Sequence, residues 1–173
     1  AMIEEPGVCN FIDEIVVMGG SIYASGTRPR VEFNILNDPE AADIVFESGV
    51  PITLIPLDVT TSVRFRKETI KPWAEADSPL IRRVHDLTVD WMEYRYIVRG
   101  EEDVGCYFHD AMNVAYLVDP DMFISVDARI VVELRGEHTR GQTVVHMGAS
   151  EAGHPISKVL VGVDRARFTR MVV

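Results

Sequence analysis

Two short apolar runs with one helix signal between them constrain this fold more than any other feature of the sequence. The runs cover residues 15–18 and 52–57, and each ends in glycine or polar residues. Between them, Asp38-Pro39-Glu40 combines an N-cap residue, a proline at the first helical position and an acidic first turn. Gly49 follows as a stop signal. Strand, loop, helix and strand in this order predict a crossover unit of an α/β sheet.

The loop after the first run carries the first candidates for ligand binding. Open α/β sheets bind ligands beyond the carboxyl ends of their strands, and Glu32 and Asn34 are expected there. In an extended segment, side chains two positions apart share a face, so this carboxylate and amide would suit sugar hydroxyls. They would equally suit a loop whose side chains bond to its own backbone. The spacing alone leaves both interpretations open.

Helical spacing returns after the second run and then gives way to strands. A long helix is expected from Ser78-Pro79, and a short one between Asp110 and Asp119. Beyond residue 121 the periodicity becomes two, which predicts strands at 122–126, 129–134, 143–147 and 158–163. Asp164 is placed to cap a terminal helix. Because no linker divides the chain, we expect a single domain over residues 1–173.

A few side chains outside that loop could also carry chemistry. Asp110 is an N-cap candidate, but His109-Asp110 as a pair also suits metal binding and proton delivery. Asp58 follows the second run and suits a cap or a catalytic carboxylate. Trp91 belongs either to the core, which we favour, or to the wall of a flat-ligand site. The other histidines lack the spacing of metal ligands.

Bulk properties exclude several classes of protein. The net charge of −10 argues against non-specific nucleic-acid binding, which needs a basic face. No apolar run reaches the roughly 18 residues of a membrane span. Cys9 and Cys106 are too few for a disulfide framework, so we expect reduced thiols in a cytoplasmic protein.

Six short segments, in this order and spacing, resemble one family, the inosine-uridine nucleoside hydrolases. The similarity runs from about residue 3 to the end and matches that family's carboxyl-terminal half. It implies an α/β fold, the carboxyl-terminal portion of a Rossmann-like open mixed sheet with flanking helices. The segments are Met18-Gly19-Gly20, Glu32-Phe33-Asn34, Asp38-Pro39-Glu40-Ala41-Ala42, Leu57-Asp58-Val59-Thr60, His109-Asp110 with Asn113-Val114-Ala115, and Thr139-Arg140-Gly141-Gln142-Thr143-Val144.

The resemblance also implies a reaction and a set of site residues. The family hydrolyses the N-glycosidic bond of ribonucleosides, releasing base and ribose, with a calcium ion that grips the ribose. By position, Asp110 matches a calcium ligand and His109 matches the histidine beside the leaving base, the candidate general acid. The matching substrate-binding residues, which hold the ribose hydroxyls or line the sugar and base, are Met18, Glu32, Phe33 and Asn34.

Two departures from the family pattern shape the expectation. Thr27 stands after Gly26 where many members have Asn, so an amide near the 5′ end of the sugar is absent. The aspartate cluster that supplies most metal ligands and the catalytic base has no counterpart in residues 1–30. Asp110 alone cannot provide the roughly six to eight oxygens that calcium prefers. We therefore expect a half-enzyme that is inactive without an amino-terminal half, whether that half is a separate chain or lost.

Three functional hypotheses remain open on the sequence. The first is part of a calcium-dependent nucleoside hydrolase that binds a nucleoside or ribose. The second is a non-catalytic remnant or interaction module of that family, and the third is a sugar-phosphate binder that uses Arg28 and Arg30. A sheet edge and helix faces left uncovered by an absent half predict a homo-oligomer.

Overall fold

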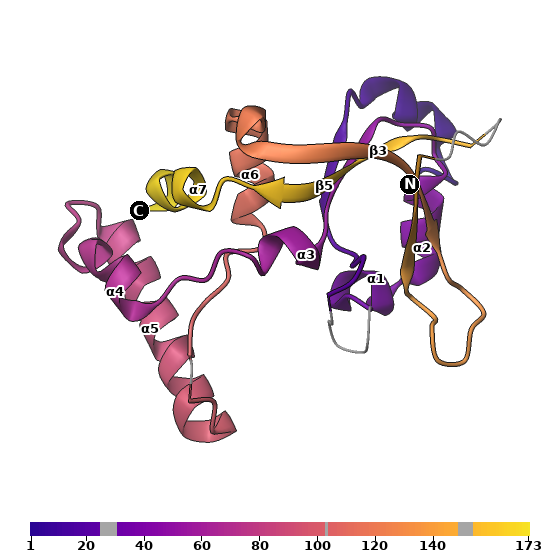
Figure 1. Ribbon diagram of the computed structural model, residues 1–173. Helices are drawn as coiled ribbons and strands as arrows, with labels where there is room; N and C mark the ends of the chain where they lie inside the picture. Colours follow the sequence, from indigo (N-terminus) through magenta and orange to yellow (C-terminus); the bar gives the residue numbers. More distant parts are fainter. Residues whose placement is uncertain (25–30, 103, 149–153) are drawn as a thin grey trace.

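The computed structural model describes residues 1–24, 31–102, 104–148 and 154–173, and its centre is a five-stranded mixed sheet. The strand order is β1-β2-β5-β3-β4 (Figure 1). β1, β2 and β5 are parallel, while β3 runs antiparallel to both β5 and β4. The strands are β1 (Ile15–Met18), β2 (Ile52–Ile55), β3 (Phe123–Val132), β4 (Thr143–Met147) and β5 (Ser157–Val163).

Helices flank this sheet, so the α/β fold predicted from the sequence is confirmed. Within the described ranges, no helix is both long and apolar enough to cross a membrane. The α-helices are α1 (Phe33–Asn37), α2 (Pro39–Phe46), α3 (Leu57–Thr60), α4 (Lys67–Ile70), α5 (Pro79–Arg99), α6 (Ala111–Val118) and α7 (Arg165–Val172). The 3-10 helices are η1 (Pro6–Phe11), η2 (Lys71–Glu75) and η3 (Pro120–Met122).

The predicted crossover unit is present as β1, α2 and β2. The Asp38 carboxylate accepts a hydrogen bond from the Ala41 amide at 3.0 Å, which caps α2 as expected. Gly49 follows the helix with a φ of +77°, a backbone conformation that residues with a Cβ atom rarely adopt. β1 and β2 pair in register from Ile15–Ile52 to Met18–Ile55. Their carboxyl ends therefore lie side by side.

The core has two halves, one on each face of the sheet. Successive strand residues point to opposite faces, so Leu54 and Val159 pack in the cluster that contains Phe46 of α2. The next residues along, Ile55 and Leu160, join the opposite cluster with side chains of α6 and α7. All four of these strand residues are 0% exposed. The central strands β2 and β5 are thus held from both sides.

Two local expectations were wrong. The strands expected at 122–126 and 129–134 form the single strand β3, because Asp127 stays in the ladder opposite Lys158 instead of breaking it. Residues 32–34 are not an extended segment, because Phe33 begins the short helix α1. Glu32 and Asn34 therefore meet as a cap and a first-turn residue of a helix.

α4 and α5 form an arm that extends away from the sheet (Figure 1). Only Thr88 and Met92 of α5 are buried, so most of this 21-residue helix faces outward. Trp91 is 49% exposed and its ring stacks on Tyr94 at 5.7 Å, so the expectation that Trp91 lies in the core was wrong. The exposed apolar stripe, which we name the α5 seam, consists of Leu80, Val84, Leu87, Trp91, Tyr94 and Val98.

Candidate active site

A pocket of about 330 Å³ lies at the carboxyl ends of β1 and β2. All six site residues that the family resemblance assigned line it, together with Leu57, while the other candidates Asp58 and Trp91 do not. Met18 ends β1, Leu57 follows β2, and the remaining residues belong to α1 and to the segment before α6. Four chain segments therefore converge on one pocket. Its lining residues are Met18, Glu32, Phe33, Asn34, Leu57, His109 and Asp110.

Glu32 lines the pocket and is also the N-cap of α1. Its carboxylate accepts hydrogen bonds from the amides of Asn34 at 2.8 Å, Ile35 at 3.1 Å and Gly20 at 3.3 Å. The residue is 4% exposed, so these donors replace the water that a buried carboxylate loses. Glu32 thus ties the β1 end to α1. The Glu32 side chain therefore bonds to the backbone, which is one of the two interpretations that the sequence left open, and it also lines the pocket.

The exposed side chains of Asn34 and Phe33 line the same pocket. The Asn34 Nδ2 lies 3.5 Å from the Met18 carbonyl oxygen and 3.7 Å from the Met18 sulfur, both long for hydrogen bonds. The amide is therefore weakly held and can donate to a ligand. Phe33 is 60% exposed, so its ring offers a flat apolar face at the pocket rim.

Two neighbouring side chains position the imidazole of His109, which also lines the pocket. Its Nδ1 lies 2.7 Å from the Thr60 hydroxyl, and the Tyr107 ring lies 5.6 Å from the imidazole, centroid to centroid. Burial lowers the pKa of His109 from its ordinary value, and the Asp110 and Glu32 carboxylates oppose that shift in part. The imidazole is therefore disposed to be neutral at neutral pH. Thr60 was not predicted as a site residue.

Asp110 occupies the N-cap position of α6 without acting as a cap. Its backbone is already helical, with φ −70° and ψ −23°, and its side chain makes no capping hydrogen bond. An Asp at this position usually accepts from the first-turn amides. Because it does not, its exposed carboxylate is available to a ligand on the pocket side.

Asp58 has a structural role that the sequence did not reveal. Its carboxylate accepts from three successive backbone amides, those of Ile22 at 2.7 Å, Tyr23 at 2.8 Å and Ala24 at 2.9 Å. This carboxylate is therefore engaged in fixing the loop after β1 against α3. The sequence showed an Asp after a strand, but its partners lie more than 30 residues away.

The described residues do not by themselves fit calcium. Across residues 1–24, 31–102, 104–148 and 154–173, no three acidic, histidine or cysteine side chains form a group that could hold a metal ion. Asp110 offers one free carboxylate, while the Glu32 oxygens already receive backbone amides. Calcium takes about six to eight oxygen ligands. The described residues of the pocket therefore supply too few free oxygen ligands for calcium.

Some predicted features fall on residues that the structure does not describe. These are Thr27, in place of the expected Asn, and the arginines at 28 and 30 that motivated the sugar-phosphate hypothesis.

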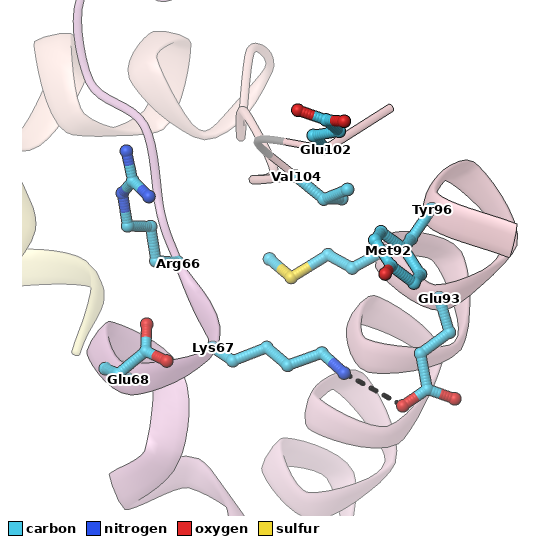
Figure 2. Close-up of a pocket in the computed structure, with 8 residues that line it drawn as sticks. All are labelled: Arg66, Lys67, Glu68, Met92, Glu93, Tyr96, Glu102 and Val104. Carbon is cyan, nitrogen blue, oxygen red and sulfur yellow. Dashed lines mark hydrogen bonds and ion pairs between the residues drawn. The ribbon is translucent and has the colours of Figure 1, made fainter. Parts of the chain in front are cut away.

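A second pocket, of about 260 Å³, separates α5 from α4 and contains none of the predicted site residues. Figure 2 shows Lys67 reaching across it to Glu93, with Nζ 2.8 Å from Oε1. Both side chains are about half exposed, so this ion pair contributes little stability, on the order of 0–1 kcal/mol. The lining is mixed in charge: Arg66, Lys67, Glu68, Met92, Glu93, Tyr96, Glu102 and Val104.

Comparison with protein families gives a match over nearly the whole chain. The family model described as "Inosine-uridine preferring nucleoside hydrolase" matches residues 1–170. The pyrimidine-specific ribonucleoside hydrolase RihA of Escherichia coli K12 is 35% identical over 169 residues, covering 96% of this chain and 53% of that protein. RihA of Enterobacter is 35% identical over 161 residues, covering 93% and 51% respectively. The chain spans about half the length of the curated relatives it matches.

Solved structures agree with this match. The purine-preferring ribonucleoside hydrolase from Gardnerella vaginalis superposes with a TM-score of 0.86 at 32% identity, covering 98% of this chain and 54% of that one. The plant nucleoside hydrolase PpNRh1 shares the fold with a TM-score of 0.87 at 24% identity, covering 99% and 56%.

Proposed function

This chain belongs to the inosine-uridine preferring nucleoside hydrolase family, and from that premise we propose that its pocket is the sugar- and base-facing part of a ribonucleoside hydrolase site. The observation that carries the proposal is convergence: one pocket gathers side chains from four segments separated by up to 92 residues, from Met18 to Asp110. The relatives include a pyrimidine-specific and a purine-preferring enzyme. The proposal therefore names ribonucleosides as the substrate class, without a choice of base.

Each side chain has a role that its surroundings support. The weakly held Asn34 amide, beside Met18, donates to a ribose hydroxyl, while a Glu32 oxygen accepts from one. The exposed ring of Phe33 packs against the base or the ribose. His109 faces the departing base, where a proton donor or a hydrogen bond stabilises the charge that leaves with it. These contacts orient the nucleoside before any bond breaks.

The reaction that these groups serve is substitution at the anomeric carbon. The C1′–N bond breaks and its electron pair leaves with the base. The oxygen of a water molecule bonds to C1′ and gives up one proton, the departing base takes up a proton, and ribose is released. Asp58 and Glu32 are both engaged by backbone amides, and we propose the free carboxylate of Asp110 as a metal ligand. Among the described residues that line the pocket, no further carboxylate remains as the base for that water.

We further propose that the calcium site is shared with polypeptide outside these 173 residues. Asp110 contributes one carboxylate, and an amino-terminal half, in a separate or continuous chain, contributes the remaining ligands and the base. Two observations support this: the described residues do not complete a calcium site, and the chain spans about half of its relatives. On this proposal the 173-residue chain alone is inactive.

The test is reconstitution. The chain is mixed or co-expressed with the amino-terminal half of E. coli RihA, and ribose release from uridine and inosine is measured with and without calcium. We expect no hydrolysis by either half alone and calcium-dependent hydrolysis by the pair. Asp110→Asn in the pair should lower the rate at least a hundredfold, as for loss of a metal ligand. A control outside the pocket, the partly exposed Asp43→Asn on α2, should leave the rate unchanged.

Folding of the pair must be established before its activity is interpreted. Co-elution in gel filtration and a single cooperative thermal transition serve as that criterion. A folded, stoichiometric pair that hydrolyses neither nucleoside would overturn the proposed function and favour a non-catalytic interaction module instead.

We also propose that the chain self-associates through the α5 seam. Its apolar residues recur at alternating spacings of four and three, the repeat of a two-helix seam, and they are 38% to 72% exposed. In an antiparallel pair that sets Leu87 against Val84 of a second copy, Arg83 faces the opposite charge of Asp90 of that copy. In this register the seam is therefore self-complementary in apolar spacing and in charge.

The two thiols support a cytoplasmic location, which we propose as well. Cys9 and Cys106 are both free and partly buried, as expected where thiols stay reduced.

A further inference from the structure

The buried hydroxyl of Thr60 is the closest polar neighbour of the His109 ring. Thr60 ends α3, directly beyond β2, and is 0% exposed. Its Oγ1 lies 2.7 Å from Nδ1 of His109, a residue 49 positions further along the chain. Since a ring nitrogen can donate or accept, the direction of this hydrogen bond determines which nitrogen of the neutral ring carries the proton.

The surroundings of Thr60 settle that direction. The neighbouring Thr61 hydroxyl donates to the Leu57 carbonyl at 2.6 Å, the usual back-bond of a helical threonine. Thr60 makes no such bond: within the described part of the chain, His109 is the only hydrogen-bond partner of its hydroxyl. A fully buried hydroxyl proton requires an acceptor. Nδ1 of His109 is the acceptor within reach, so it must lack a proton.

We propose that Thr60 is a positioning residue that holds neutral His109 as the Nε2-protonated tautomer, with Nε2–H directed at the substrate. The proposal rests on the proposed function of the pocket, and it specifies what His109 offers there. The ring lines the pocket while Nδ1 faces Thr60, so Nε2, on the other side of the ring, is the nitrogen left for a ligand. The leaving base thus meets a hydrogen-bond donor from a neutral imidazole.

This assignment requires a hydrogen-bond acceptor on the leaving base. A donor at Nε2 requires a lone pair on the base, such as a ring nitrogen or a carbonyl oxygen. Both purine and pyrimidine bases carry one of these. With the opposite tautomer, Nε2 would be an acceptor and would repel the same lone pair. Thr60, which does not line the pocket, therefore sets the polarity of the group that does.

The experiment is nitrogen NMR of the free chain, labelled with 15N-histidine and recorded near pH 8, where the ring is neutral. His109→Gln identifies the signals of His109 among those of the five histidines. In the wild type we expect Nε2 to show the shift of a protonated nitrogen and Nδ1 that of an unprotonated, hydrogen-bonded one. Protonation at Nδ1 in the wild type would overturn the proposal without any variant.

Thr60→Val and Thr60→Ser give the matched comparison. Valine keeps the shape but removes the hydroxyl, so both His109 nitrogen shifts should move toward the averaged values of exchanging tautomers. Serine keeps the hydroxyl and should retain the wild-type pattern. An unchanged pattern in a folded Thr60→Val variant would also overturn the proposal. The measurement uses no substrate, so failure of reconstituted hydrolysis would leave its result standing, and the reverse holds as well.

Discussion

At the scale of single residues, carboxylates in this protein organise backbone as much as they bind ligands. Glu32 and Asp58 each accept hydrogen bonds from three backbone amides. The amides bound to Asp58 lie in the loop after β1, and those bound to Glu32 lie in that loop and in α1. The pocket is rigid where these carboxylates act and open where Asn34 and Asp110 point. Rigid support beneath adaptable donors is what pre-organised binding of a polar ligand requires.

Replacing Glu32 should be more costly than replacing an ordinary helix cap. Glu32→Ala removes hydrogen bonds to three amides, of which two are buried, and should lower the free energy of unfolding by about 2–3 kcal/mol. Asp38→Ala removes one exposed capping bond and should cost about 1 kcal/mol. Urea unfolding of the two variants measures both. Equal losses would contradict the three-amide role of Glu32.

His109 should make stability depend on pH in one direction. Its pKa is lowered by burial in the folded chain, so the unfolded chain binds the proton first as pH falls. The stabilising contribution is therefore complete above about pH 6.5 and is lost as pH falls through the lower folded pKa. Urea unfolding between about pH 8 and pH 5 should show this decline. His109→Gln should show less of it, and identical profiles would argue against a lowered pKa.

At the scale of elements, α5 leaves exposed a row of apolar side chains of the kind that usually lies buried. The six apolar residues of the α5 seam face outward, while Thr88 and Met92 mark the buried side. Burying a large apolar side chain is worth about 1.5–3 kcal/mol, so an exposed row of them favours association strongly. Self-pairing of α5 is the prediction that belongs at this scale.

Disrupting the α5 seam should dissolve the assembly. Trp91→Glu should raise the dissociation constant at least tenfold, measured by sedimentation equilibrium, because a ring that is 49% exposed in one copy is covered in the pair. Tyr96→Glu, at an aromatic residue 61% exposed outside the seam, is the matched control and should change little.

Charge reversal tests the register of the pair. Arg83→Asp should weaken association, and Arg83→Asp combined with Asp90→Arg should restore it. A wild-type chain that remains monomeric at micromolar concentration would contradict self-association altogether.

The elements also show what local sequence can and cannot determine. The crossover β1-α2-β2 was predicted because its signals, such as Asp38 and Gly49, act within a few residues. α1 was not predicted, since it has five residues and its cap is Glu32, outside the usual set of cap residues. Periodicity identified the helix carrying Trp91 but could not show whether anything covers that face.

The site was predictable in its members but not in its supports. Met18, Glu32 and His109 follow strands or precede helices at the edge where α/β sheets bind ligands, so sequence and family resemblance brought them together. The sequence left Asp58 open as a cap or a catalytic carboxylate, and it did not single out Thr60. Their partners lie tens of residues away, and only the packing of β2 against its neighbours reveals them.

At the scale of the whole molecule, the chain has a well-packed interior and an incomplete site. Both faces of β2 are buried, and the two core clusters contain fully buried side chains such as Phe65 and Leu54. The sheet therefore brings the residues that line the pocket together, while the described residues hold no acidic cluster of the kind that calcium requires.

β1 provides an edge along which a further strand can align with the sheet. β1 is the outer strand of the described sheet on one side, and its last residue, Met18, enters the pocket. A strand added parallel to it would run about 4.8 Å away and would end at the same rim. Residues that follow such a strand would be delivered beside Met18 without any further guidance. An incoming segment thus needs only to match a four-residue edge for its carboxyl end to reach this pocket.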